Sequence, residues 1–109
     1  MRAILENVKK GKYLKEHMID EDLFEVDEDY YLLFITEEHI VYINIKEKNV
    51  MWEFDTGSLR NIEKDQDGIR LIWDNKCEST MLLPEKRDVE RAMEMLKNVL
   101  AMKSYSKNY

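Results

Sequence analysis

Cysteine, proline and glycine are scarce in this chain of 109 residues, which contains one Cys, one Pro and three Gly. The lone Cys77 excludes a disulfide framework and a cysteine-based metal site, and it favours a reducing compartment. With so few chain-breaking residues and 44% hydrophobic residues, the sequence predicts one compact domain that folds without disulfides or metal.

Long apolar runs are also missing. The longest uncharged stretch, Tyr30–Thr36, is far shorter than the roughly 18 residues that a membrane-spanning helix needs. Charged Arg2 and Glu6 flank the first apolar residues, so no secretory signal is predicted either. We therefore expect a cytoplasmic protein that meets membranes only peripherally.

Positive charge is in short supply. Lys and Arg number 17 against 23 Asp and Glu, which gives a net charge of −6. A negative protein is repelled, on average, by phosphate backbones and by anionic lipid headgroups. The charge balance therefore excludes nucleic acid as the expected partner.

The hydrophobic pattern changes period twice along the chain. Residues 2–10 have helical spacing and end at Gly11, which predicts a short helix with a glycine C-cap. Alternation then predicts seven strands, at 13–18, 30–36, 39–45, 50–54, 59–64, 68–73 and 79–83, with Val50, Trp52 and Phe54 on one face. After Pro84, apolar residues spaced three and four apart predict an amphipathic helix.

This order of elements predicts an α+β fold. Seven antiparallel strands followed by one helix is the order of a PH-like domain, a β-sandwich or barrel capped by its C-terminal helix. The expected organisation is a short N-terminal helix or extension at residues 1–10, the PH-like domain at 11–103, and a frayed tail at 104–109.

Residues suited to catalysis are few and do not form a motif. His17, His39 and Cys77 are the only candidates besides the carboxylates, and none has a recognisable partner in the sequence. His39 is expected at the rim of a strand, and the isolated glycines form no phosphate-binding loop. We expect no enzyme, no cofactor and no metal site.

Seven acidic residues without a compensating base are expected in the loop between the first two strands. They are either a solvated loop or a docking surface for a basic protein partner. Asp27 and Glu28 are candidates for that contact. Leu23 and Phe24, embedded among the acids, either anchor the partner or pack inward, with core burial favoured for Phe24.

Two further surfaces are candidates for binding. Lys9, Lys10, Lys12 and Lys15 form the only dense basic cluster, which either complements a helix end or attracts anionic lipid weakly. By analogy with related shapes, the strand at 59–64 is a sheet edge that accepts a peptide strand, with Leu59, Arg60 and Ile62 as contacts.

Several segments match a known family in order and spacing. They are Gly11-Lys12-Tyr13, Leu33–Thr36, Ile40–Ile43, Trp52–Phe54 followed by Leu59 and Ile62, and Gly68-Ile69. Together they resemble the extreme C-terminal PH-like domain of the vacuolar protein sorting-associated protein 13 family, the bridge-like lipid transfer proteins. His39 and Asp55 depart from the family pattern, where a basic residue and a proline are common.

The resemblance implies a piece of a long protein that conducts lipids between membranes at an organelle contact site. It also implies localisation through an Arf-type small GTPase or a membrane-protein adaptor, with phosphoinositide affinity in some members. We expect a non-catalytic adaptor domain that docks through a protein partner. Direct binding of anionic lipid through the lysine cluster is the alternative, and packing against the remainder of the parent protein is a third.

Overall fold

The computed structural model describes Tyr13 and residues 15–106, with the backbone alone described from residue 103 on. The chain divides into two compact units, Met1–Thr56 and Gly57–Tyr109, which are described one at a time. The helix expected at residues 2–10 and its glycine cap lie outside the described residues.

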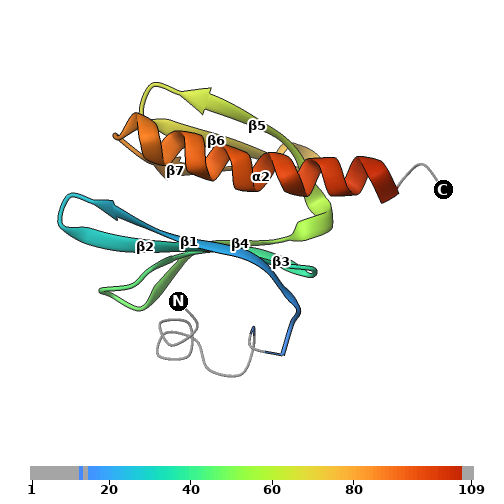
Figure 1. Ribbon diagram of the computed structural model, residues 1–109, viewed down its shortest axis with the longest axis horizontal. Helices are drawn as coiled ribbons and strands as arrows, with labels where there is room; N and C mark the ends of the chain where they lie inside the picture. The colour runs from blue at the N-terminus through green and yellow to red at the C-terminus, as the bar shows by residue number, and fades with distance from the viewer. Residues whose placement is uncertain (1–12, 14, 107–109) are drawn as a thin grey trace. The chain divides into compact units, whose positions relative to one another are not determined.

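The N-terminal unit contains a four-stranded antiparallel meander in the order β1-β2-β3-β4 (Figure 1). Its strands are β1 (Met18–Val26), β2 (Asp29–Thr36), β3 (His39–Asn44) and β4 (Asn49–Asp55). The last three match the predicted strands to within a residue or two because hydrophobic segments joined by short polar links pair as hairpins.

The first strand lies later in the chain than predicted. Tyr13 and Glu16 belong to a turn, with the Glu16 amide donating to the Tyr13 carbonyl at 3.1 Å, whereas β1 begins at Met18. The expected acidic loop is therefore wrong: Asp20 to Glu25 are strand residues paired with β2. Only Asp27 and Glu28 form the turn.

The turn between β1 and β2 is strained. Asp27 and Glu28 have φ of 51° and 65°, as in the two-residue turns whose twist suits a hairpin. This left-handed conformation costs a residue with a Cβ about 1–2 kcal/mol, and glycine or asparagine adopts it more easily.

Replacing the turn by Asn-Gly should therefore stabilise the protein. We expect the double variant D27N/E28G to gain about 1 kcal/mol in free energy of unfolding, measured by urea denaturation. The variant E37Q/E38Q, which changes the net charge by the same amount at another turn, should stay near wild type. A gain of equal size in both variants would assign the effect to charge and contradict the backbone explanation.

A β-bulge at Met51 divides the residues of β4 between two faces. Tyr42 is paired with Trp52 but the next residue, Ile43, is paired with Val50, so Met51 is the extra residue. The prediction that Val50, Trp52 and Phe54 share a face is wrong for this reason: a bulge reverses the alternation on one side of it.

Each face of the sheet has its own apolar side chains. Val50 packs with Met18, Leu23 and Ile45 around a buried cluster composed of Tyr13, Leu32, Phe34, Val41 and Ile43. On the other face the rings of Tyr31, Tyr42, Trp52 and Phe54 follow one another across the strands, with centroids 5.3 to 6.1 Å apart. We call the first set the apolar cluster.

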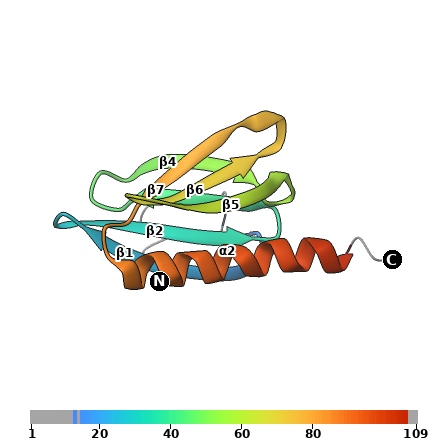
Figure 2. The same ribbon diagram turned by 90° about the horizontal axis from the view of Figure 1, so that it is seen from above.

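The C-terminal unit contains a three-stranded antiparallel sheet and a helix. The sheet has the order β5-β6-β7, with β5 (Leu59–Asp65), β6 (Gly68–Trp73) and β7 (Glu78–Leu82). Short 3-10 turns, η1 (Thr56–Ser58) and η2 (Asp74–Lys76), precede β5 and β7. The helix α2 (Lys86–Ser106) is one continuous rod (Figure 2). It contacts β5 and β6.

The amphipathic pattern of α2 is confirmed. Ala92, Leu96 and Val99 are buried, as is Met95, while Met102 is 49% exposed. Asp88, in the first turn of the helix, is buried, and its Oδ1 lies 3.3 Å from a guanidinium nitrogen of Arg91. A negative charge at this end of the helix also complements the helix dipole. The helix continues to Ser106, and the frayed tail expected at 104–109 stays a prediction.

Gly68 is required by close backbone packing at the start of β6. It has a φ of 149°, and a Cβ there would lie 1.9 Å from the Met81 carbonyl oxygen and 2.7 Å from the Leu83 nitrogen. Neither backbone atom can move without disturbing the β6–β7 pairing. Gly57, in contrast, has no atom within 4 Å of such a Cβ.

These two glycines provide a matched pair of substitutions. We expect G68A to lose about 3 kcal/mol or more in free energy of unfolding, because both the contact and the φ are unfavourable. G57A should change it by less than about 1 kcal/mol. Urea denaturation of both variants checks this, and similar midpoints for the two would show that the Gly68 contact relaxes at little cost.

The fold class predicted from the sequence is confirmed. In the part of the chain that the structure describes, seven antiparallel strands in two sheets and a C-terminal helix form an α+β protein, in the element order expected of a PH-like domain. The limits of that domain, 11–103, stay a prediction.

Candidate functional site

The strand predicted to accept a peptide, β5, is an edge strand of its sheet. Leu59 and Ile62 are nevertheless buried, at 0% and 9% exposure, because an irregular register at Arg60 turns both toward the face of Trp73 and Leu71. Only Arg60 is exposed, and it forms an ion pair with Asp74. The Leu59 and Ile62 side chains are therefore not exposed to a partner, and the expected contact at this sheet edge stays a prediction.

Leu23 and Phe24 are neighbours on β1 and point to opposite faces. Phe24 is fully buried, as predicted, and Leu23 is half-buried against the apolar cluster. Neither is an exposed anchor for a partner. In this part of the predicted site the exposed residues are Asp27 and Glu28, at the tip of the hairpin.

The whole β1–β2 hairpin is acidic. From Met18 to Thr36 it carries seven acids and no Lys or Arg: Asp20, Glu21, Asp22, Glu25, Asp27, Glu28 and Asp29. Several carboxylates bond to their own strand, such as Asp20 to the Glu21 amide and Asp29 to the Tyr30 amide. We call this element the acidic hairpin, and its tip is the part most open to a partner.

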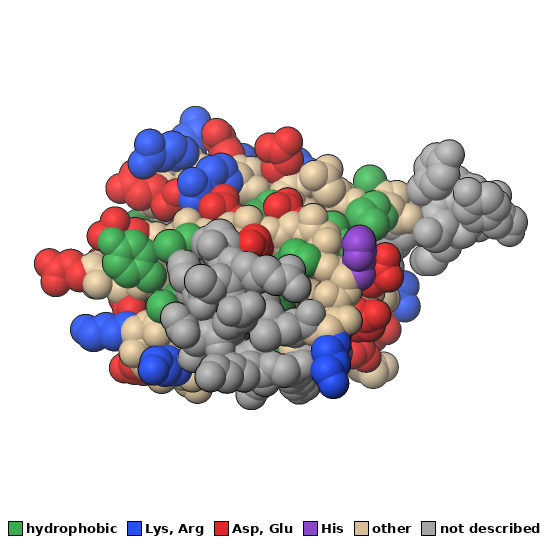
Figure 3. All heavy atoms as spheres, turned by 60° about the horizontal axis from the view of Figure 1, so that its bottom comes forward, with side chains coloured by type: hydrophobic (Ala, Val, Ile, Leu, Met, Phe, Trp, Pro, Cys, Tyr) green, Lys and Arg blue, Asp and Glu red, His purple; other side chains and the backbone are tan. Residues whose placement is uncertain are grey.

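The basic cluster is described at one residue only. Lys15 is exposed, while Lys9, Lys10 and Lys12 lie outside the described residues. Acidic side chains border the face seen in Figure 3, and a histidine lies beside some of them at one side.

A polar cluster that the sequence did not reveal lies at the end of the sheet away from the hairpin tip. The ring of His39 lies 2.8 Å from Glu16 through Nδ1, and 3.5 and 3.8 Å from Glu53 and Asp55 through Nε2. Oε1 of Glu16 also accepts a hydrogen bond of 2.6 Å from the Thr36 hydroxyl. We call this group, together with Tyr13, the polar clasp.

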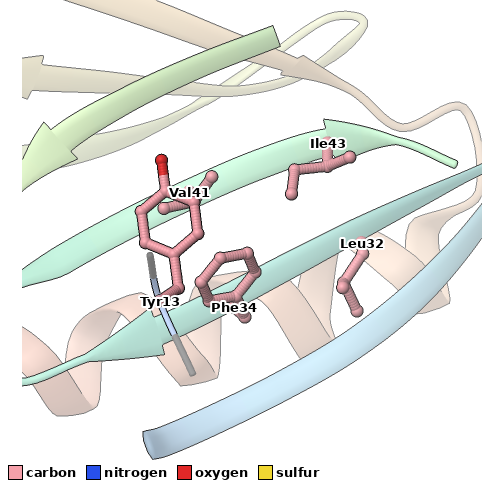
Figure 4. Packing of buried hydrophobic residues seen from close by; sticks show 5 residues of the cluster. All are labelled: Tyr13, Leu32, Phe34, Val41 and Ile43. Carbon is pink, nitrogen blue, oxygen red and sulfur yellow. The ribbon is translucent and has the colours of Figure 1, made fainter. Parts of the chain in front are cut away.

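Tyr13 joins the polar clasp to the apolar cluster. Its ring is fully buried, edge-on to Phe34 at 5.1 Å, and it lies over the residues of β2 and β3 in Figure 4. Its hydroxyl donates to Glu53. Desolvation, followed by the bond to Glu53 and the negative charges of Glu53 and Glu16, raises the pKa of Tyr13 far above its ordinary value.

This raised pKa predicts a loss of stability at alkaline pH. Above about pH 10 the phenol ionises in the unfolded chain but stays protonated in the folded protein, so stability falls as pH rises. Y13F should remove that dependence and cost about 1–2 kcal/mol at pH 7, since Glu53 loses its donor. The control Y30F, at an exposed ring, should keep the wild-type dependence. Denaturation at pH 7, 9.5 and 11 measures both effects, and parallel profiles for Y13F and wild type would contradict the assignment.

A comparison with protein families identifies the family to which the chain belongs. Residues 2–98 match the model of the family described as intermembrane lipid transfer protein VPS13, C-terminal. The chain belongs to this VPS13 C-terminal family. No curated protein shows significant similarity to the chain.

The resemblance noted in the sequence is thereby confirmed, and it places this VPS13 C-terminal domain in a family of lipid transfer proteins. Among the described residues, no helix is long and apolar enough to cross a membrane. Within the same residues, no group of three or more His, Cys, Asp or Glu is suited to hold a metal ion.

Proposed function

We propose that this domain is a non-catalytic adaptor that docks a lipid transfer protein on an acceptor membrane through a protein partner. The charge of the acidic hairpin is the observation that carries the proposal. Family membership supplies the lipid transfer context, and the adaptor would act in the cytoplasm, peripherally, at organelle contact sites. The partner would be an Arf-type small GTPase or a membrane-protein adaptor, as the family resemblance implies.

The sign of the charge favours protein over lipid. A phosphoinositide headgroup carries several negative charges and is held by clustered Lys and Arg side chains. The acidic hairpin, residues 18–36, is instead negatively charged. It therefore repels anionic lipid and attracts a basic protein surface.

The tip of the hairpin suits such a contact better than β5 does. Asp27 and Glu28 are exposed and form a turn, so a partner reaches them without displacing core residues. At β5 the apolar side chains are buried and Arg60 is paired with Asp74. We therefore centre the docking surface on Asp27 and Glu28.

The variant D27N/E28G tests this surface without weakening the fold, because it relaxes the strained turn as it removes two charges. We expect its affinity for a purified, GTP-loaded Arf-type GTPase to fall roughly tenfold at physiological salt. E37Q/E38Q, with the same change in net charge, should bind within about twofold of wild type. Titration of both variants and wild type against the GTP- and GDP-loaded forms measures this, and equal affinities would refute the tip as the docking surface.

Vesicle sedimentation tests the lipid alternative in parallel. Wild type should sediment weakly with phosphoinositide vesicles at low salt and lose that binding at physiological salt, because surface electrostatics are screened. Strong binding at physiological salt that disappears in K9Q/K10Q/K12Q/K15Q would overturn the proposal in favour of direct lipid recognition. Failure of both the GTPase and the lipid assays would leave packing against the remainder of the parent protein.

A further inference from the structure

Two turns of opposite charge lie at the same end of the N-terminal sheet (Figure 1). The tip of the acidic hairpin joins β1 to β2 and contains Asp27 and Glu28. The turn at residues 45–48 joins β3 to β4 and contains Lys46 and Lys48, and we call it the basic turn. The two turns are adjacent because β2 and β3 are neighbours in the meander.

Hydrogen bonds between β2 and the end of β3 hold the two turns in place. The Ile45 amide donates to the Tyr30 carbonyl at 2.9 Å. The Asn44 side-chain amide donates to Asp29 at 2.8 Å, and its oxygen accepts from the Glu47 amide at 3.0 Å. This end of the sheet is therefore ordered before any contact forms, so association there costs little conformational entropy.

The charges of the two turns do not neutralise each other. Asp27, Glu28, Lys46 and Lys48 are all exposed, and within the part of the chain that the structure describes their side chains form no ion pair or hydrogen bond. Opposite charges on β5 and β6, in contrast, do pair. Glu47 lies between the two lysines, so the basic turn keeps a net charge of +1.

Tyr30 adds an apolar contact between the turns. It belongs to β2, follows the acidic tip, and is bonded through its backbone to Ile45 at the start of the basic turn. It is 45% exposed, one of four large hydrophobic residues with this much exposure among the described residues. A tyrosine on a rigid strand is a suitable interface residue, because its ring offers a large contact area and loses little freedom on binding.

This surface is complementary to itself. In a twofold symmetric interface the same patch is present on both copies, and when residue i of one copy contacts residue j of the other, j also contacts i. A patch of one sign would repel its copy. Here a rotation about an axis between the two turns brings the acidic tip of each copy onto the basic turn of the other.

We propose that this end of the sheet binds a second copy of the chain, in a dimer held by two contacts between acidic tip and basic turn, with the Tyr30 rings near the twofold axis. The net charge of −6 opposes association at long range. At physiological ionic strength the Debye length is about 8 Å, so that repulsion is largely screened, whereas contacts between the turns are screened less.

A second copy and a protein partner would compete for Asp27 and Glu28, because these residues also form the docking surface proposed above. The dimer does not rest on that function. It is tested with the purified chain alone, and the GTPase titration therefore fails or succeeds independently of it.

Charge reversal at either turn should prevent the dimer. By sedimentation equilibrium at physiological salt, wild type should pass from monomer to dimer as its concentration rises. In D27K/E28K both turns are positive, and in K46E/K48E both are negative. We expect the dissociation constant of each variant to rise at least roughly tenfold. A wild type that stays monomeric up to about 1 mM, a weak affinity for any specific contact, would overturn the proposal.

Mixing the two variants is the decisive step. The positive turns of D27K/E28K are complementary to the negative turns of K46E/K48E, so an equimolar mixture should form a dimer that neither variant forms alone. General attraction cannot produce this result, because the wild type has a charge of −6 and each change shifts it by four, which leaves both variants negative. A mixture that stays monomeric while wild type dimerises would overturn the proposal.

Matched reversals elsewhere control for net charge. E37K/E38K changes two exposed acids of the β2–β3 turn, at the other end of the sheet, and K64E/K97E changes two exposed lysines of the C-terminal unit. Both should dimerise within about threefold of wild type. Equal weakening by the controls and by the reversals at the two turns would assign the effect to net charge and contradict this interface.

Discussion

Met51 is the extra residue of the bulge in β4, and the composition of both faces of the N-terminal sheet depends on it. With regular alternation, Val50 would share a face with Trp52 and Phe54, and Glu53 would lie opposite. The bulge instead brings Val50 to the face of the apolar cluster, where Glu53 already lies beside Val41, and leaves the aromatic rings on the other face. The polar clasp exists because Glu53 reaches the side of the sheet that Tyr13 covers.

Much of the fold could be predicted from periodicity. Strands β2, β3 and β6 are dense in apolar residues, the helix α2 has apolar residues three and four apart, and most of these residues are buried. β1 could not be predicted in the same way. It is an edge strand whose six positions before Phe24 are all half-buried and include three acids, so its composition resembles that of a loop even though its backbone pairs with β2.

The candidate sites were harder to predict because they depend on register. In a regular strand, Leu59 and Ile62 would point to opposite faces, and one would be open to a partner. The irregularity at Arg60 turns both inward. The polar clasp depends on residues up to 40 apart in sequence, such as Tyr13 and Glu53, and local patterns contain no information on such pairs. Of the residues in the polar clasp, only His39 was noticeable in the sequence, as an ionisable residue at the start of a strand.

The docking surface and the polar clasp lie at opposite ends of one strand, and this separates their energetics. Asp29 follows the acidic tip and Thr36 belongs to the clasp, so the eight residues of β2 lie between them, roughly 25 Å. Exposed charges this far apart are screened at physiological ionic strength, where the Debye length is about 8 Å. Changes at sites so distant, with no shared partners, act additively on stability. Partner binding at the tip therefore leaves the polar clasp unaffected unless the sheet itself deforms. The four buried residues between the ends, Leu32, Leu33, Phe34 and Ile35, oppose such a deformation.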